Sequence, residues 1–260
     1  MEILVFIKQV PDTETRIRIS EDKKSIVEED LAFILNPYDE FAIEEALRIR
    51  EARGGKVTAV SVGKEKVTTV LKKALAMGVD EAILIKDEAG ETYDGFRIAK
   101  IISEFIRKEF PVYGLLFFGK QAIGSDNAVI PSMVGEFLTI PSITVVTKLT
   151  VENGKGKVHR EIEGATEVVE FSLPAIISAQ KGLNEPRYET LKGIMAAKKK
   201  EIKIFTLEGL GLKEEDLSPS IEISKIDYPP PRKEGRIIDG TPEEAVKKLV
   251  ELLRNEAKVI

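Results

Sequence analysis

Residues Lys56–Lys86 read KVTAVSVGKEKVTTVLKKALAMGVDEAILIK, and this stretch holds the pattern that decides the fold. Lys56–Val62 is an apolar run with the length of a strand buried in a parallel sheet. After a turn at Gly63, Lys66–Met77 indicates a helix, and Glu81–Lys86 indicates a second strand. A strand, a helix and a strand of these lengths predict a parallel βαβ unit with a right-handed crossover.

The same alternation continues on both sides of this unit. Before it, Ile3–Val10 is an apolar strand, and Thr15–Ser20 with Lys24–Val27 forms an excursion hairpin. A helix follows over Tyr38–Arg53, with Asn36 as N-cap and Pro37 at the first helical position. After it, Tyr93–Phe110 indicates a helix and Tyr113–Gly119 a strand. Beyond the loop at Gly119, another helix extends to Phe137. We therefore expect an α/β fold with a mostly parallel, doubly wound sheet.

The pattern changes after Pro141. Consecutive strands without intervening helices predict an antiparallel region, at Ile143–Val151, Lys157–Ile162, Thr166–Ser172 and Ala175–Ala179. A short helix over Leu191–Lys199 follows, then an extended arm at Pro229–Pro231 and a terminal helix from Thr241 to about Ala257. We expect residues 1–228 to form a nucleotide-binding domain and residues 229–260 to form a C-terminal arm.

The composition excludes several classes of function. The 260 residues carry a net charge of −5, which argues against nucleic acid as a partner. The chain has no cysteine and a single histidine, His159, which disfavours metal sites, cysteine nucleophiles and a Ser/His/Asp triad. With no signal peptide and no apolar run long enough to span a membrane, we expect a cytoplasmic protein, with any membrane association made through a partner subunit.

In an open parallel sheet, ligands bind outside the carboxyl ends of the strands. The loop Gly119–Gly135 follows such an end, although neither GxGxxG nor GxxxxGK[ST] is present. Gly119 and Gly124 permit close backbone approach, and the next helix would attract an anion at its N-terminus. This predicts a nucleotide site, although by spacing alone a small polar loop before a helix is more often an ordinary turn.

Asp39 has two interpretations from sequence alone. As an acid in the first turn of a helix, it complements the helix dipole. As a residue near a strand end, it could contact a ribose hydroxyl or the side of a flavin.

Several ordered motifs make the chain resemble the β subunit of electron transfer flavoproteins nearly from end to end. They are Lys8–Asp12, Asn36–Glu40, Ala74–Gly78, Gly119–Ile123, Arg160–Gly164 and, most specifically, Leu183–Leu191 (LNEPRYETL) followed by Ile194-Met195 and a lysine run. The resemblance implies a heterodimer with an α subunit, whose flavin passes electrons to partner oxidoreductases. It implies no catalytic side chain in this subunit and no metal.

The resemblance also implies the ligand. The β subunit of the ordinary branch holds AMP, whereas the electron-bifurcating branch holds a second FAD. That FAD takes electrons from NADH and divides them between ferredoxin and, through the α-subunit flavin, a quinone or acyl-CoA dehydrogenase. Tyr38-Asp39, Asp126 and Ala128 resemble the bifurcating branch, so we expect FAD, with AMP as the alternative. Gly124, Val129 and Pro131 depart from both patterns, which usually carry Asp, Gln and Gly there.

Matching positions transfer the family's sites to this chain. The cofactor-binding residues are expected to be Phe6, Lys8, Asn36, Pro37, Tyr38, Asp39, Val62, Gly63, Gly119, Gln121, Gly124, Ser125, Asp126, Asn127, Ala128, Val129, Ile130 and Ser132. Residues Leu183–Met195 resemble a recognition loop in which Leu191 anchors to the partner dehydrogenase, with Tyr188, Ile194 and Met195 beside it. By the residues alone, the same stretch is a proline-bearing connection into a short core helix. The C-terminal arm is expected to reach the α subunit.

A competing hypothesis is an enzyme that hydrolyses nucleotides or transfers an adenylyl group on a similar sheet. Such an enzyme needs a Gly/Ser-rich phosphate loop with a basic residue, or an acid pair for a metal. The sequence contains neither.

Overall fold

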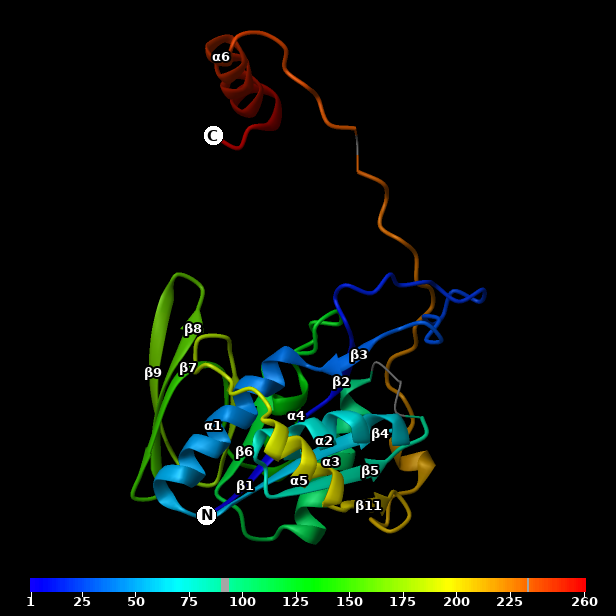
Figure 1. Ribbon diagram of the computed structural model, residues 1–260, viewed down its shortest axis with the longest axis vertical. Coiled ribbons are helices and arrows are strands. Elements are labelled where there is room, and N and C mark those ends of the chain that lie inside the picture. The colour runs from blue at the N-terminus through cyan, green and yellow to red at the C-terminus, as the bar shows by residue number, and fades with distance from the viewer. Residues whose placement is uncertain (90–93, 233) are drawn as a thin grey trace. The chain divides into compact units, whose positions relative to one another are not determined.

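The computed structural model of the chain describes residues 1–89, 94–232 and 234–260 (Figure 1). Contacts within the chain divide it into two units, Met1–Ser224 and Lys225–Ile260. The first unit carries the sheet and most of the helices. The second carries an extended segment and a terminal helix.

A nine-stranded sheet forms the centre of the first unit, in the order β11-β5-β4-β1-β6-β10-β7-β8-β9. All neighbours from β11 to β7 are parallel, while β7-β8 and β8-β9 are antiparallel. The strands are β1 Glu2–Phe6, β4 Lys56–Gly63, β5 Glu81–Lys86, β6 Leu115–Gly119, β7 Ser142–Glu152, β8 Lys155–Ile162, β9 Ala165–Ser172, β10 Ala175–Ala179 and β11 Ile202–Thr206. The predicted α/β class with a mostly parallel sheet is therefore confirmed.

Helices cover both faces of this sheet. They are α1 Pro37–Arg53, α2 Thr68–Met77, α3 Gly95–Glu109, α4 Ile130–Leu138 and α5 Leu191–Lys199, with short 3-10 turns at Glu65–Val67 and Glu214–Leu217. Alternate residues of β1 point to opposite sides: Ile3 and Val5 join α1, α2 and α5 in one core cluster, while Leu4 and Phe6 join α3 and α4 in the other. This alternation is what a strand buried on both faces requires.

Two features of the topology differ from the sequence-based expectation. β10 is not antiparallel, because it lies between β6 and β7 and pairs with both in parallel. The apolar run Ile3–Val10 is also not one strand: β1 ends at Phe6, and β2 (Gln9–Pro11) pairs with β3 (Phe33–Leu35) in a separate antiparallel ribbon. In both cases the partner strand is distant in sequence, so the local pattern did not indicate it.

Other boundaries agree or differ slightly. The excursion hairpin is present as an antiparallel bridge between Ile19 and Ile26. The start of the helix predicted at Tyr93 lies outside the described residues, and α3 begins at Gly95 with Asp94 as N-cap. Strand β11 was not anticipated. It extends the sheet beyond β5 in parallel.

The second unit contains α6 (Pro242–Leu252), which continues as a π-helical turn over Leu253–Ala257. Thr241 and Glu244 form a capping box at its start. None of its residues is buried, and Val246, Leu249 and Val250 form an exposed apolar stripe at helical spacing. Across the described parts of the chain, none of the helices combines the length and apolarity needed to cross a membrane.

Candidate functional site

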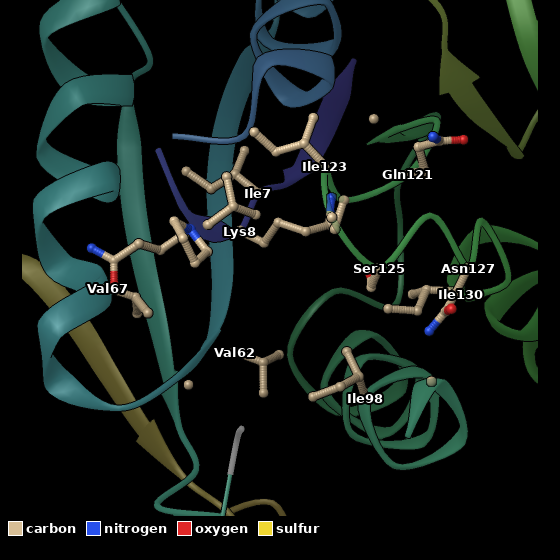
Figure 2. A pocket seen from close by; sticks show the side chains of 18 of the residues that line it. Ile7, Lys8, Val62, Val67, Ile98, Gln121, Ile123, Ser125, Asn127 and Ile130 are labelled. Atoms are coloured by element: carbon tan, nitrogen blue, oxygen red, sulfur yellow. The ribbon is translucent and has the colours of Figure 1, made fainter. Parts of the chain in front are cut away.

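A cavity of about 590 Å³ opens at the carboxyl ends of β1, β4 and β6 (Figure 2). The order of the strands explains its position. From β1 the chain continues to β4 and β5 on one side and then returns to β6 on the other side. Open α/β sheets bind ligands at such a switch point, where the connections on either side of the strands separate.

The inner part of the cavity is apolar. Phe6 and Phe118 come from the adjacent strands β1 and β6 and stack with ring centroids 4.7 Å apart. Val62 from β4 and Ile98 from α3 also line this part of the cavity (Figure 2). These side chains form a slot suited to a flat aromatic ring such as a purine.

One wall of the cavity is formed by residues 119–129, which we call the nucleotide loop after the ligand expected from the sequence. Its backbone alternates into the left-handed region at Gly124 (φ 101°), Asp126 (φ 51°) and Ala128 (φ 53°). Successive N–H groups in such an alternation converge on an anion. Among the described residues, no protein acceptor receives the N–H groups of Asn127, Ala128 and Val129. Since α4 starts at Ile130, its N-terminus adds a favourable dipole.

Asn36 holds the beginning of this loop. It occupies the N-cap position of α1, but its side chain makes no capping bond. Its Nδ2 instead donates to the Gln121 carbonyl at 2.9 Å, and its Oδ1 accepts from the Ile123 N–H at 3.1 Å. The same Nδ2 donates to Asp39 Oδ1 at 2.9 Å. A fully buried side chain thus fixes both sides of one loop residue.

Asp39 is fully buried and paired with Lys8. Its carboxylate accepts the Lys8 N–H at 2.7 Å and the Lys8 ammonium at 2.8 and 3.1 Å. Burial raises the pKa of the Asp39 carboxyl, while Lys8 and Asn36 oppose that rise. Gly119 packs against the same group, because a Cβ at Gly119 would lie 2.2 Å from Asp39 Oδ1.

The predicted cofactor residues therefore fall into two groups. Those that line the cavity are Phe6, Lys8, Val62, Gly63, Gly119, Gln121, Gly124, Ser125, Asn127, Ala128, Val129 and Ile130. Those that do not line it are Asn36, Pro37, Tyr38, Asp39, Asp126 and Ser132. Asp126 turns its carboxylate back to Gln121 Nε2, within the loop.

Sequence reasoning missed part of the lining. Ile17 and Ile26 of the excursion hairpin also line the cavity, together with Phe33 and Val67. The hairpin was predicted, but nothing local indicated that its apolar residues face the ligand cavity. Asp94 was also missed. It lines the cavity and uses its carboxylate to cap α3.

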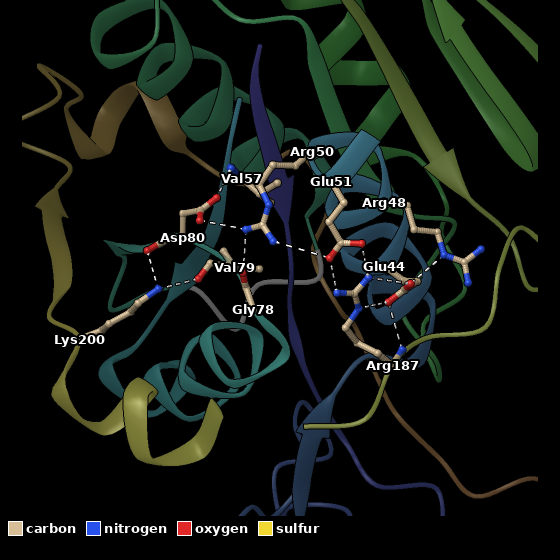
Figure 3. A network of polar contacts seen from close by, with 10 residues as sticks. All are labelled: Glu44, Arg48, Arg50, Glu51, Val57, Gly78, Val79, Asp80, Arg187 and Lys200. Carbon is tan, nitrogen blue, oxygen red and sulfur yellow. Dashed lines mark hydrogen bonds and ion pairs between the residues drawn. The ribbon is translucent and has the colours of Figure 1, made fainter. Parts of the chain in front are cut away.

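A second polar cluster lies on α1, away from its N-terminus (Figure 3). Arg187 donates to Glu44 through its Nε and its backbone N–H, at 2.7 and 3.1 Å, and to Glu51 through Nη1, at 2.6 Å. Asn184, which is mostly buried, donates to the Phe41 carbonyl at 3.0 Å. These contacts fix the segment before α5 along the surface of α1.

The other end of that segment is also fixed. The Lys200 ammonium, just after α5, donates to the carbonyls of Val79 and Asp80, both at 2.9 Å (Figure 3). Close packing holds α5 against α2, since a Cβ at Gly193 would lie 2.3 Å from the Ala76 carbonyl oxygen. The segment 183–200 is therefore an ordered frame.

The charges in this cluster shift one another's pKa values. Burial alone would raise the pKa of Glu44, but hydrogen bonds from Arg187 and Arg48 more than offset it, and the pKa lies below its ordinary value. The hydrogen bond from Arg187 likewise lowers the pKa of Glu51. Both carboxylates are thus held in the charged state at neutral pH.

The frame presents apolar side chains outward. Tyr188 is 94% exposed, Leu191 84% and Met195 62%. Ile194, which was predicted beside them, packs instead against the core cluster of α1 and α2. Ala197 is the residue of α5 that is buried. Three large side chains of one ordered segment are thus exposed to solvent.

Comparison with known proteins agrees with this geometry. The family model described as "Electron transfer flavoprotein domain" matches residues 24–209. "Electron transfer flavoprotein subunit beta" of Bacillus subtilis (strain 168) is 40% identical over 262 residues, covering 100% of both chains. The proteins of the same name from Thermoanaerobacterium thermosaccharolyticum and Mus musculus are 41% and 36% identical, each covering 98% of both chains.

These matches extend through the switch-point cavity and through the exposed segment after Asn184. The identity to several full-length relatives is well above the level at which only a fold is shared. The chain therefore belongs to the electron transfer flavoprotein family, among its β subunits.

Proposed function

We propose that this β subunit binds an adenine nucleotide cofactor in the switch-point cavity and carries electrons as part of a heterodimer with an α subunit. The observation that carries the proposal is an apolar slot placed directly beside converging backbone N–H groups. The slot suits the adenine and the N–H groups suit the phosphate. These two features support the adenylate half of any ligand, so they suit FAD and AMP equally.

The remaining apolar lining of the cavity supports FAD rather than AMP. It includes Ile17, Ile26 and Phe33, together with Val67. A mononucleotide would leave this apolar surface uncovered, whereas the isoalloxazine of FAD would bury it. The residues present therefore fit FAD, with the nucleotide loop holding its diphosphate and the hairpin side chains facing its ring.

Bound FAD would supply a hydride acceptor for NADH and a one-electron donor to ferredoxin and, through the α-subunit flavin, to a quinone or acyl-CoA dehydrogenase partner. The chain's own part is to bind and orient the cofactor. Phe6 and Phe118 bury its adenine, and Asn127–Val129 receive its phosphates. The cavity residues thus determine its position and its access to water.

The decisive experiment is the absorbance spectrum of the purified α/β complex, combined with nucleotide analysis of the denatured supernatant. We expect two flavins per heterodimer and no AMP. One flavin with one releasable AMP would instead assign the subunit to the non-bifurcating branch, in which AMP is a structural ligand. Bleaching of the flavin spectrum by NADH alone tests the electron donor.

We further propose that Leu191 anchors the partner dehydrogenase, with Tyr188 and Met195 around it. A single apolar side chain that enters a partner's pocket can supply most of the energy of a transient interface. The ordered frame supports this role, because a preorganised anchor loses little conformational entropy on binding.

The α subunit is the proposed partner of the C-terminal arm. The apolar stripe of Val246, Leu249 and Val250 is not buried by any described residue of its own unit. An amphipathic helix of this kind gains stability by burying its stripe against another surface. Deletion of residues 229–260 should therefore weaken α/β association in gel filtration and leave the sheet folded by far-UV circular dichroism.

A further inference from the structure

We infer that Asn36 and Asp39 are positioning residues for the nucleotide loop and do not themselves touch the ligand. The inference rests on the proposed function, since it concerns the same nucleotide cavity. It assigns these two residues a role different from the direct contact expected from the resemblance, and also different from that of a helix-dipole acid.

Asn36 has no group left for a ligand. Its amide offers two N–H donors, and these are taken by the Gln121 carbonyl and Asp39 Oδ1. Its oxygen accepts the Ile123 N–H, and the residue is completely buried. An Asn at an N-cap position normally accepts from its own helix, and here that bond is absent. Its side chain is used for the loop instead.

Asp39 is equally committed. Both carboxylate oxygens accept from Lys8, one of them also accepts from Asn36, and the side chain has 0% exposure. Gly119 blocks the remaining approach, because its Cα packs against the carboxylate with no room for a side chain. A ribose hydroxyl therefore cannot reach this acid without displacing the loop itself.

The loop needs contacts that hold its backbone in place, and we call the contacts made by Asn36 and Asp39 a clamp. Asp126 and Ala128 are not glycines, and each left-handed conformation costs roughly 1 kcal/mol unless its surroundings impose it. Asn36 fixes Gln121 and Ile123, and the carbonyl of Ala122 between them accepts the Asp126 N–H at 3.1 Å. The clamp is thus connected, through one hydrogen bond, to the first non-glycine residue of the alternation. Asp39 in turn orients Asn36.

The pairing also directs Lys8 away from the phosphate. The Lys8 side chain lines the cavity, but its ammonium is bonded to both oxygens of Asp39. Lys8 is thus not a donor to the phosphate, which leaves the backbone N–H groups of the loop and the other lysines that line the cavity, Lys64, Lys66 and Lys120. Affinity for a nucleotide consequently depends on the geometry of that loop.

A thermodynamic cycle, in which one change is made in the protein and the other in the ligand, distinguishes a positioning role of Asp39 from a direct contact with the ribose. The probes are AMP, 2′-deoxy-AMP and 3′-deoxy-AMP, titrated calorimetrically into the nucleotide-free α/β complex with wild-type or Asp39→Asn β subunit. We expect the variant to weaken AMP binding about tenfold, a loss of 1.4 kcal/mol. Removing either hydroxyl should weaken binding by the same factor in both proteins, because the two changes are independent.

A direct contact predicts the opposite result. If Asp39 bonded a ribose hydroxyl, the loss on removing that hydroxyl would disappear in the variant, and the inference would be overturned. The matched control is Glu40→Gln, which removes the neighbouring first-turn acid, whose partner is Lys73. Equal weakening by Glu40→Gln would show a helix-dipole effect and would also overturn the inference.

Amide hydrogen exchange provides a readout that needs no ligand. In the nucleotide-free complex, Asn36→Ala should accelerate exchange at the Ile123 amide at least tenfold and leave the amides of β4 unchanged. Unchanged exchange at Ile123 contradicts the clamp. If wild-type complex binds neither AMP nor FAD, the proposed function fails, while the exchange result still decides the inference.

Discussion

Helix α1 holds two functional segments, and it holds them by different means. At its N-terminus, Asn36 and Asp39 fix the nucleotide loop through side chains with no exposure. Along its surface, Glu44 and Glu51 fix the segment before α5 through Arg187, which is 33% exposed. The first segment presents backbone N–H groups to a cavity. The second presents Tyr188 and Leu191 to solvent.

The difference is consistent with the ligands that we propose for the two segments. A phosphate is bound by donors within tenths of an ångström of their ideal position, so its loop is fixed by short, buried side chains with few rotamers. An apolar anchor has no such angular requirement. It needs a stable base, and long charged side chains on the surface of a helix provide that at a smaller desolvation cost.

Gly119→Ala should have the largest effect on stability, because its new side chain would clash with Asp39, which together with Asn36 forms the first clamp, the one that fixes the nucleotide loop. The new Cβ would lie 2.2 Å from Asp39 Oδ1 and 2.6 Å from the Tyr38 carbonyl carbon. We expect a loss of about 3 kcal/mol in the free energy of unfolding. Urea denaturation followed by far-UV circular dichroism measures it, since the chain has no tryptophan for fluorescence.

Gly124→Ala is the matched control in the same loop. A Cβ there meets no atom within 4 Å, although the φ of +101° disfavours it. The loss should be about 1 kcal/mol, from backbone strain alone. Equal losses at Gly119 and Gly124 would mean that the packing against Asp39 contributes nothing special.

Arg187→Ala should have the next largest effect, because it breaks the second clamp, which is the set of ion pairs from Arg187 to Glu44 and Glu51. We expect a loss of about 2 kcal/mol at neutral pH, reduced from the value for a fully buried pair by solvent screening. Arg187→Lys should recover less than half of it, since one ammonium cannot replace the planar fork between two carboxylates. An unchanged free energy of unfolding for Arg187→Ala would show that these ion pairs do not stabilise the protein.

The same variant gives a pH test with a defined sign. Both Glu44 and Glu51 have pKa values lowered from the ordinary 4.5, so their stabilisation is complete above that value. It is lost as the pH falls from 4.5 through the lower pKa values of the folded state. The stability difference between wild type and Arg187→Ala should therefore shrink at acidic pH. A difference that stays constant from pH 7 to pH 3 contradicts the ion-pair interpretation.

Salt should affect the stabilisation from the two clamps differently, and this difference should be smaller than the effects above. Raising the salt concentration to about 0.5 M should reduce the contribution of the partly exposed Arg187 by roughly half. The effect of Asp39→Asn should not change, because Asp39 is shielded from solvent. Urea denaturation of both variants at low and high salt compares them, and equal sensitivity would contradict the distinction.

Leu191→Ala should have the smallest effect on stability and a large effect on function. The side chain is 84% exposed, so the free energy of unfolding should change by less than about 0.5 kcal/mol. The rate of electron transfer between the α/β complex and a partner dehydrogenase should fall about tenfold in stopped-flow measurements. Val112→Ala, at an apolar site 80% exposed and outside the segment, is the control and should leave the rate unchanged.

Local sequence signals were sufficient for most of the first unit. The alternation of apolar strands and helices in Lys56–Lys86 predicts parallel pairing, and β4 and β5 pair in that way. Asn153-Gly154 predicts a tight turn, and both residues adopt positive φ between β7 and β8. The convergence of strand ends also predicted where a ligand cavity would lie.

Contacts between residues distant in sequence decided the rest. β10 inserts between β6 and β7, and the excursion hairpin places Ile17 and Ile26 in the cavity. A hydrophobic pattern records that a segment is buried and does not record its neighbour. For that reason, neither arrangement was predictable from the segments themselves.

What the sequence determined by itself is therefore the α/β class, the edge of the sheet at which the cavity lies and, through its motifs, the family. What only the tertiary structure decided is the use of individual polar side chains. Asn36 and Asp39 were expected to contact the cofactor, yet their side chains bond to Lys8, Gln121 and Ile123, as many as 87 residues away. A buried polar group must satisfy its hydrogen bonds with whatever the fold places next to it, and that placement is a property of the packed chain.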